Sequence, residues 1–371
     1  MGEDVESLVK DLVAINSVSG NEEELANYLH DYLEAQGVET INQDGNVVVE
    51  LKNGSDKALH FNAHMDTVDA DPDKWEYSPW SPTVEDGRIY GLGASDVKGS
   101  IAALIKAIED LKDRELDLDL YFAFVKKEEI DGSGTEAFMD YYIEEGLNEK
   151  YSNQACVLTE PTGLEAIEIG CKGLVFLEIT TQGESAHGSR PSKGDNATLR
   201  MLEVVEKLKE LKNEFKDYQH PLLGEPTISI ATTIESGGSI NKLPSSCRMT
   251  CDIRTVPGMH DQVMELVEEK AGHLAEIETT GRPVPPVLTP EDEEICTVAK
   301  KAAGVEFTTA TGSDDSIFYS KNGINTVVLG PGEKKAIHRP DEYIETKKVE
   351  DAVDNYIKIA EHFSEIEVGE E

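Results

Sequence analysis

The sequence contains no long apolar run and little positive charge. No stretch approaches the ~18 consecutive apolar residues that a transmembrane helix requires, so we expect no membrane partner. The N-terminus, Met1-Gly2-Glu3-Asp4, is acidic and lacks the apolar region of a signal peptide. The sequence therefore predicts a cytoplasmic protein.

Lys and Arg are scarce relative to Asp and Glu. The chain has 34 basic residues against 74 acidic residues, which gives a formal net charge of −40. A surface of this charge repels phosphate backbones and anionic lipids, so we expect no nucleic-acid partner. Two explanations of the acidity remain open. The protein is adapted to a salt-rich cytoplasm, or it is simply acidic and bound divalent metal offsets a little of the charge.

Cysteine is also rare, and no two cysteines form a CxxC pair. An odd number of cysteines without a secretory signal predicts reduced thiols rather than disulfides or a metal cluster. The five positions are Cys156, Cys171, Cys247, Cys251 and Cys296.

The length of 371 residues and the hydrophobic content of 39% predict about two globular domains. Helical and extended patterns alternate in the first part of the chain and return near its end. This alternation indicates an α/β layered domain whose central sheet is mixed and mostly parallel. The predicted helices include 5–15, 24–37, 100–111 and 349–363, and the predicted strands include 46–51, 58–68, 119–125 and 325–332.

The pattern changes from about Gly173 onward. Apolar periodicity there predicts the order strand, helix, strand, strand, helix, which is close to the β-α-β-β-α-β order of a ferredoxin-like module. The predicted segments are 174–183, 197–215, 227–236, 247–256 and 261–274. Because α/β units follow again after residue 283, we interpret this module as an insertion.

Several His, Asp and Glu residues lie where apolar strands end or beside Gly and Pro turns. Each of them alone is ordinary polar surface. Taken together, they occupy the positions where the active sites of α/β sheets lie. Mixed imidazole and carboxylate ligation suits zinc, cobalt or manganese better than calcium. The set comprises His64, Asp66, Asp96, Glu128, Glu129, Glu160 and His338.

Nine motifs, in order along the chain, resemble one enzyme family. This is the dinuclear-zinc metallopeptidase and deacylase family that includes acetylornithine deacetylase, succinyl-diaminopimelate desuccinylase and the glutamate carboxypeptidases. The motifs are HMDTV, GLGASDVKGS, EEIDGSG, TEPT, SAHGSRPSKGDNA, GGSINKLPSSC, DIRTVPG, TGSDDSIF and HRPDEY. The resemblance implies a catalytic α/β/α domain built from residues 1–172 and 284–371. It also implies that residues 173–283 form an inserted ferredoxin-like lid and dimerisation domain.

The resemblance further implies a site for two divalent metal ions, most simply zinc, with cobalt or manganese as alternatives. Asp96 would bridge the two ions. His64 and Glu160 would complete one ligand set, and Glu129 and His338 the other. Glu128 would act as the general base, and Asp66 would orient His64.

The inserted module carries the remaining expected site residues. His187 matches a histidine that reaches into the active site of the partner subunit in family dimers, so we expect a homodimer. Asn241 and Arg254 match substrate contacts, and an arginine suits a bidentate hold on a free carboxylate. Gly312, Ser313 and Asp314 match a loop that lines the substrate pocket.

The leading functional hypothesis is removal of an acyl group from a small N-acyl amino acid, of the acetylornithine deacetylase or succinyl-diaminopimelate desuccinylase type. A dipeptidase or carboxypeptidase with the same metals is the alternative, because pocket shape separates the two and the motifs do not. A two-metal phosphoesterase would require more cationic residues near the metals. A metal-free binding homologue would lack a ligand or the base, whereas all are present.

Overall fold

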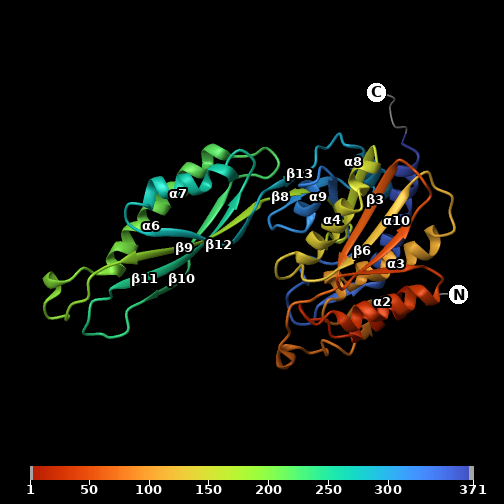
Figure 1. Ribbon diagram of the computed structural model, residues 1–371. Helices are drawn as coiled ribbons and strands as arrows, with labels where there is room; N and C mark the ends of the chain where they lie inside the picture. The colour runs from red at the N-terminus through yellow and green to blue at the C-terminus, as the bar shows by residue number, and fades with distance from the viewer. Residues whose placement is uncertain (1–2, 367–371) are drawn as a thin grey trace. The chain divides into compact units, whose positions relative to one another are not determined.

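The computed structural model describes residues 3–366 and divides into two units (Figure 1). Unit 1 contains the chain up to Ile169, the segment Thr289–Thr308 and the chain from Asp314 onward. Unit 2 contains Gly170–Leu288 and Thr309–Ser313, so the expected insertion 173–283 lies within it. Within the described residues, no helix is both long enough and apolar enough to span a membrane.

The main sheet of unit 1 is mixed. Its strand order is β1-β2-β6-β3-β7-β15-β8-β13, and β14 also pairs with β8. The three parallel pairings are β6 with β3, β3 with β7 and β7 with β15, all in the middle of the sheet. The pairings nearer the two edges are antiparallel: β1 with β2, β2 with β6, β15 with β8 and β8 with β13. The strands are β1 (Thr40–Gln43), β2 (Asn46–Leu51), β3 (Lys57–His64), β6 (Asp119–Val125), β7 (Asn153–Leu158), β8 (Ile167–Cys171), β13 (Val287–Leu288), β14 (Phe307–Ala310) and β15 (Asn325–Val328).

Helices cover both faces of this sheet because its strands present apolar side chains on alternate faces. Leu59 and Phe61 of β3 face a core that also contains buried residues of α1, α2, α3, α8 and α10. Tyr121 and Ala123 of β6 face a second core with α4 and α9, and Figure 1 shows β3 and β6 between α4 and α10. The helices of unit 1 are α1 (Val5–Ala14), α2 (Glu23–Ala35), α3 (Gly99–Leu111), α4 (Ser133–Glu144), α5 (Leu147–Lys150), α8 (Glu294–Ala303), α9 (Ser316–Ser320) and α10 (Thr346–Ser364).

Unit 1 also holds a small antiparallel sheet, in the order β16-β5-β4. Its strands are β4 (Thr83–Glu85), β5 (Arg88–Tyr90) and β16 (Tyr343–Glu345). The pairing of Ile344 with Ile89 joins β16, the strand before the last helix, to the segment that precedes Asp96. Two distant parts of the sequence are therefore held side by side near the candidate site residues.

Unit 2 has the β-α-β-β-α-β order that the sequence pattern indicates. All strand pairings in its sheet are antiparallel, and the strand order is β10-β11-β9-β12. Alternate residues of β9, such as Val175 and Leu177, pack against Met201 and Leu208 of α6. The elements are β9 (Gly173–Gln182), α6 (Ala197–Glu214), β10 (Thr227–Ser236), β11 (Ser246–Thr255), α7 (Val263–Ala271) and β12 (Glu276–Val284).

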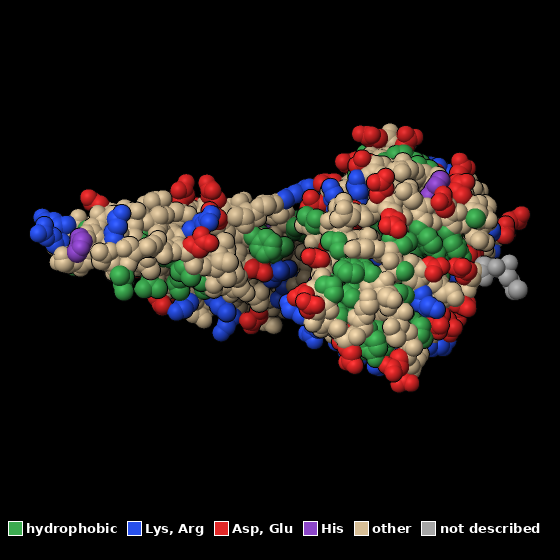
Figure 2. Space-filling view, turned by 90° about the horizontal axis from the view of Figure 1, so that it is seen from below, with side chains coloured by type: hydrophobic (Ala, Val, Ile, Leu, Met, Phe, Trp, Pro, Cys, Tyr) green, Lys and Arg blue, Asp and Glu red, His purple; other side chains and the backbone are tan. Residues whose placement is uncertain are grey.

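Acidic side chains are spread over the surface. In Figure 2, Asp and Glu side chains lie across the visible face with Lys and Arg between them. The five cysteines are buried and none forms a disulfide in the structure.

His60 is a buried imidazole on the α4 side of the main sheet. Its ring stacks on Tyr121, with 5.0 Å between ring centroids, and meets Tyr142 edge-on at 4.7 Å. Neither ring nitrogen has a hydrogen-bond partner among the described residues. Burial lowers the pKa of His60 from 6.5 to about 3 because the aromatic surroundings disfavour its charged form.

We predict that His60→Phe reduces the loss of stability at acid pH. The unfolded chain takes up a proton on His60 below pH 6.5, whereas the folded chain does not until about pH 3. Stability is therefore lost as the pH falls through this window, by about 2 kcal/mol at pH 5. Urea unfolding of both proteins at pH 8 and pH 5 measures the difference. An unchanged difference between the two pH values would contradict the prediction, and exposed His273→Phe is the control.

Candidate metal centre

The candidate site residues lie at the carboxyl ends of adjacent parallel strands. His64 is the last residue of β3, Glu128 and Glu129 follow β6, and Glu160 follows β7. Because β6, β3 and β7 are parallel neighbours, their carboxyl ends meet at one edge of the sheet. The topology therefore brings together residues that are far apart in the sequence.

Asp96 lies between the two histidines and offers a different oxygen to each. His64 Nε2 is 3.1 Å from Asp96 Oδ1 and 3.7 Å from Glu160 Oε1. His338 Nε2 is 3.3 Å from Asp96 Oδ2 and 2.9 Å from Glu129 Oε1.

These five residues form two groups whose potential ligand atoms lie within 4.8 Å of one another, and Asp96 belongs to both. A third group of this kind joins His64 to Glu128 and Glu129. The structure thus brings together all five residues that sequence analysis expected as ligands, together with Glu128.

Asp66 holds the turn that carries the two glutamates. One of its carboxylate oxygens accepts the backbone N–H of Glu128 at 3.0 Å, and the other accepts that of Glu129 at 3.2 Å. The Ser19 hydroxyl donates a further hydrogen bond at 2.6 Å. His64 Nδ1 lies 2.8 Å from the backbone carbonyl of Asp66 and 3.6 Å from its carboxylate. Asp66 therefore contacts the imidazole through its backbone carbonyl and holds the turn through its carboxylate.

Glu342 accepts backbone hydrogen bonds from the turn that carries Asp96, as Asp66 does from the turn that carries the two glutamates. This buried carboxylate accepts backbone N–H groups from Gly93 at 3.0 Å, Ser95 at 2.8 Å and Asp96 at 3.0 Å. These groups belong to an irregular turn at Ala94–Lys98, in which the φ/ψ angles of Asp96 are not helical. The backbone of this turn makes its own bond from the Lys98 N–H to the Gly93 carbonyl, and the carboxylate of Glu342 adds three more that hold its path.

Burial and neighbouring negative charges make ionisation of the glutamates unfavourable. Burial first, and then the charge of Glu160, raise the pKa of Glu128 well above its usual value. Burial likewise raises the pKa of Glu160, against the opposing effect of His64. A cluster of this kind is stable only when protons or metal cations neutralise it.

The pKa values of the two histidines are also raised, which for an imidazole favours the charged form. Hydrogen bonds to Asp96 and Glu129 raise the pKa of His338 to about 10. Burial opposes a charged His64, yet Glu160, Asp66 and Asp96 together raise its pKa well above the usual value. The raised pKa values favour protonated imidazoles, whose positive charge offsets part of the charge of the carboxylates. Nitrogen and oxygen donors in this number and spacing fit divalent zinc, cobalt or manganese.

Asp315 adds another buried carboxylate near the site. Its Oδ2 accepts a 2.6 Å hydrogen bond from the Thr135 hydroxyl. Burial raises the pKa of Asp315 to about 7, and its charge is among the causes that raise the pKa of Glu128. Sequence analysis named neither Asp315 nor Glu342 as a site residue, although both lie inside the motifs TGSDDSIF and HRPDEY.

Two candidate residues of unit 2, His187 and Asn241, lie on neighbouring loops. An isolated antiparallel bridge pairs His187 with Lys242, and the N–H of Gly188 donates to the carbonyl of Asn241 at 2.7 Å. The His187 side chain is exposed, and its Nδ1 lies 2.8 Å from the Ser189 hydroxyl.

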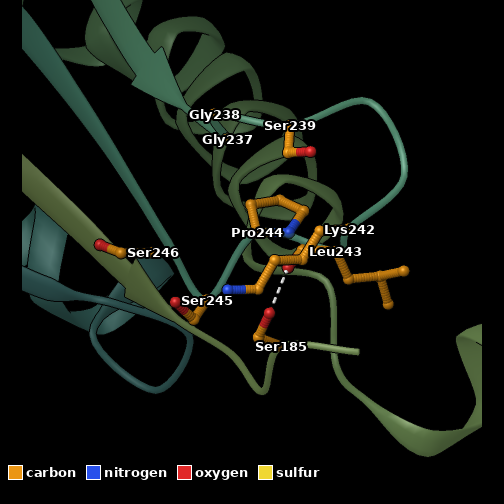
Figure 3. Close-up of a pocket in the computed structure, with 9 residues that line it drawn as sticks. All are labelled: Ser185, Gly237, Gly238, Ser239, Lys242, Leu243, Pro244, Ser245 and Ser246. Carbon is orange, nitrogen blue, oxygen red and sulfur yellow. Dashed lines mark hydrogen bonds between the residues drawn. The ribbon is translucent and has the colours of Figure 1, made fainter. Parts of the chain in front are cut away.

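Beside these loops is a pocket of about 290 Å³ in which the Ser185 hydroxyl donates to the Leu243 carbonyl (Figure 3). Four serines and one lysine, Lys242, contribute to its lining. The complete lining is Ser185, Gly237, Gly238, Ser239, Lys242, Leu243, Pro244, Ser245 and Ser246.

The remaining expected substrate contacts also lie in unit 2. Arg254 is held by its neighbour Asp252, with its Nε 2.8 Å from one carboxylate oxygen and its Nη2 3.0 Å from the other. Gly312 and Ser313 belong to unit 2, whereas Asp314 belongs to unit 1.

We predict that Glu342→Gln weakens metal binding by about 10- to 100-fold, the usual effect of removing a group that supports a metal ligand. The amide nitrogen of Gln would face backbone N–H donors that now meet a carboxylate oxygen, so the turn carrying Asp96 would shift. Competition with a chromophoric chelator measures the affinity. Glu345→Gln, an exposed carboxylate three residues away, is the matched control. Equal affinities in the two variants would contradict the prediction.

Comparison with known proteins agrees with the geometry. Residues 60–363 match the sequence pattern of peptidase family M20/M25/M40. An acetylornithine deacetylase from Pectobacterium carotovorum is 28% identical over 311 residues, which cover 81% of this chain and 79% of that protein.

Two solved structures share the fold. An M20 family metallo-carboxypeptidase from Sulfolobus solfataricus superposes with a TM-score of 0.78 at 24% identity, covering 98% of this chain and 100% of the other. A dinuclear metal-binding M20 peptidase from Bacillus subtilis gives a TM-score of 0.71 at 19% identity, covering 96% of each chain. The family match spans most of the chain and includes His64, Asp96, Glu128, Glu129, Glu160 and His338. The chain belongs to peptidase family M20/M25/M40 and is a hydrolase of amide bonds.

Proposed function

We propose that this protein removes the acyl group from a small N-acyl amino acid, using two divalent metal ions per chain. The observation that carries the proposal is the position of Asp96, whose two oxygens face two separate ligand groups. A carboxylate placed in this way can bridge two ions. The similarity to an acetylornithine deacetylase supports a deacylase.

Each proposed ion has its own ligands besides Asp96. His64 and Glu160 would hold one ion, and Glu129 and His338 the other. Zinc suits this mixture of nitrogen and oxygen donors best, with cobalt or manganese as alternatives. Loading both ions would displace the protons that the raised pKa values place on His64 and His338, so binding should release protons.

When bound, the ions would polarise the substrate carbonyl and increase the acidity of a water molecule. Glu128 would take the proton from this water as it attacks the amide carbon, and would then give the proton to the leaving nitrogen. Asp66 fixes the backbone of Glu128, so the base keeps its position while its side chain exchanges the proton. The raised pKa of Glu128 suits a group that must both accept and return a proton.

Unit 2 would bind the amino acid part of the substrate. Arg254, Asn241, Gly312 and Ser313 are the proposed contacts, and His187 would stabilise the oxyanion in the partner subunit of a homodimer. Large apolar side chains are exposed on unit 2, and such an interface would cover some of them. They include Phe176, Leu199, Leu202, Ile234 and Ile240.

A dipeptidase or carboxypeptidase is the second candidate. The metallo-carboxypeptidase from Sulfolobus solfataricus shares the fold over nearly the whole chain, which supports this alternative. Turnover of N-acetylornithine and N-succinyl amino acids against a panel of dipeptides separates the two. We expect the acyl amino acids to react faster.

We predict that Glu128→Gln lowers kcat by about 100- to 10,000-fold, because it removes the general base, and keeps about two metal ions per chain. Glu129→Gln removes a ligand instead, so it should reduce metal content as well as activity. Elemental analysis and hydrolysis assays, before and after chelation, measure both quantities. Full activity of Glu128→Gln, or of the chelated protein, would overturn the proposed mechanism.

A further inference from the structure

Unit 1 contains a hollow of about 490 Å³ that the mechanism above does not use. One of its walls is His338, a proposed metal ligand. The rest of the lining comes from the loop after β3, from Leu92 and from the residues that follow His338. The complete lining is Val68, Asp69, Ala70, Asp71, Pro72, Lys74, Trp75, Leu92, His338, Arg339 and Pro340.

Hydrogen bonds hold the walls of this hollow together. The carboxylate of Asp341 accepts the backbone N–H of Glu76 at 2.8 Å and that of Tyr77 at 3.0 Å. The N–H of Leu92 donates to the carbonyl of Pro79 at 2.8 Å. These contacts fix the loop after β3 against the segment that carries His338 and Arg339, so the hollow is preformed.

The lining is mixed: two acidic side chains, two basic side chains and His338 stand among six apolar residues. Asp71 and Lys74 form an ion pair at 3.2 Å, and Asp69 accepts the N–H of Ala70 at 2.8 Å. The exposed guanidinium of Arg339 has no carboxylate partner among the described residues.

An arginine without such a partner is unusual in a chain of net charge −40. Most of the other arginines form ion pairs with carboxylates, namely Arg88, Arg114, Arg200, Arg248 and Arg254. Arg339 is therefore available to bind an anion that comes from outside the chain.

We propose that this hollow binds the acyl group of the substrate and that Arg339 binds a carboxylate at the far end of that group. The inference rests on the proposed function, which assigns the amino acid part to unit 2 and leaves the acyl part for unit 1. The volume lies within the usual range of ligand sites, whereas an acetyl group would leave most of it empty. A cation without a carboxylate partner, beside apolar side chains such as Val68 and Leu92, fits a short dicarboxylic acyl group such as succinyl. The substrate class is then N-succinyl rather than N-acetyl amino acids.

Binding of two product analogues to the zinc-loaded protein tests this subsite without requiring turnover. Succinate and butanoate have the same number of carbons, and only succinate carries a second carboxylate. We expect calorimetry to show that succinate binds about tenfold or more tightly than butanoate, since a bidentate arginine pair contributes this much. Arg339→Gln should abolish the preference, and Arg339→Lys should retain part of it.

Arg114→Gln is the matched control, because it removes an arginine charge from unit 1 outside the hollow. The control should keep the preference for succinate. Equal binding of the two acids by the unchanged protein, or a preference that survives in Arg339→Gln, would overturn the proposal.

Hydrolysis assays distinguish failure of this proposal from failure of the proposed function. We expect kcat/KM to be higher for N-succinyl than for N-acetyl amino acids. Arg339→Gln should lower kcat/KM for N-succinyl amino acids about tenfold and leave kcat/KM for N-acetyl amino acids unchanged. Turnover of acyl amino acids with no effect of Arg339 would overturn the subsite alone. Absence of turnover of any acyl amino acid, together with succinate binding that depends on Arg339, would overturn the proposed function and leave the subsite.

Discussion

The mutual repulsion of buried carboxylates is the constraint on which the rest of this site depends. Asp96, Glu128, Glu129 and Glu160 converge at one edge of the sheet, with only two imidazoles among them. In such surroundings an unpaired carboxylate is costly, which is why the pKa values of Glu128 and Glu160 are raised. Two divalent cations would remove this repulsion and would do so without protonating the base.

The backbone prepares the site for those cations. Asp66 accepts the N–H groups of the turn that carries Glu128 and Glu129, and Glu342 accepts those of the turn that carries Asp96. Both turns are irregular, and these side-chain acceptors add to the few backbone hydrogen bonds that the turns make themselves. The parallel strands β6, β3 and β7 then place the glutamate turn, His64 and Glu160 at a common edge. Preorganised donors and ligands of this kind lower the cost of ordering the site when metal and substrate bind.

The sequence was sufficient to select the residues that the structure brings together, and Asp66 beside them, but not Glu342. His64 and His338 are 274 residues apart, yet both stand in motifs whose order along the chain identifies the family. The contribution of Glu342 was not predictable, because it consists of contacts to backbone N–H groups that exist only in the folded turn. Alternation of apolar residues predicted the two-sided main sheet and the order of unit 2, but it did not reveal α4. The small and polar residues that open α4 obscure its helical period.

Anomalous X-ray scattering from zinc-loaded crystals tests the central claim most directly. The account predicts two zinc peaks about 3.5–4 Å apart, with Asp96 between them. One peak should contact His64 and Glu160, and the other Glu129 and His338. A single peak, or two peaks that do not share Asp96, would contradict the two-metal account.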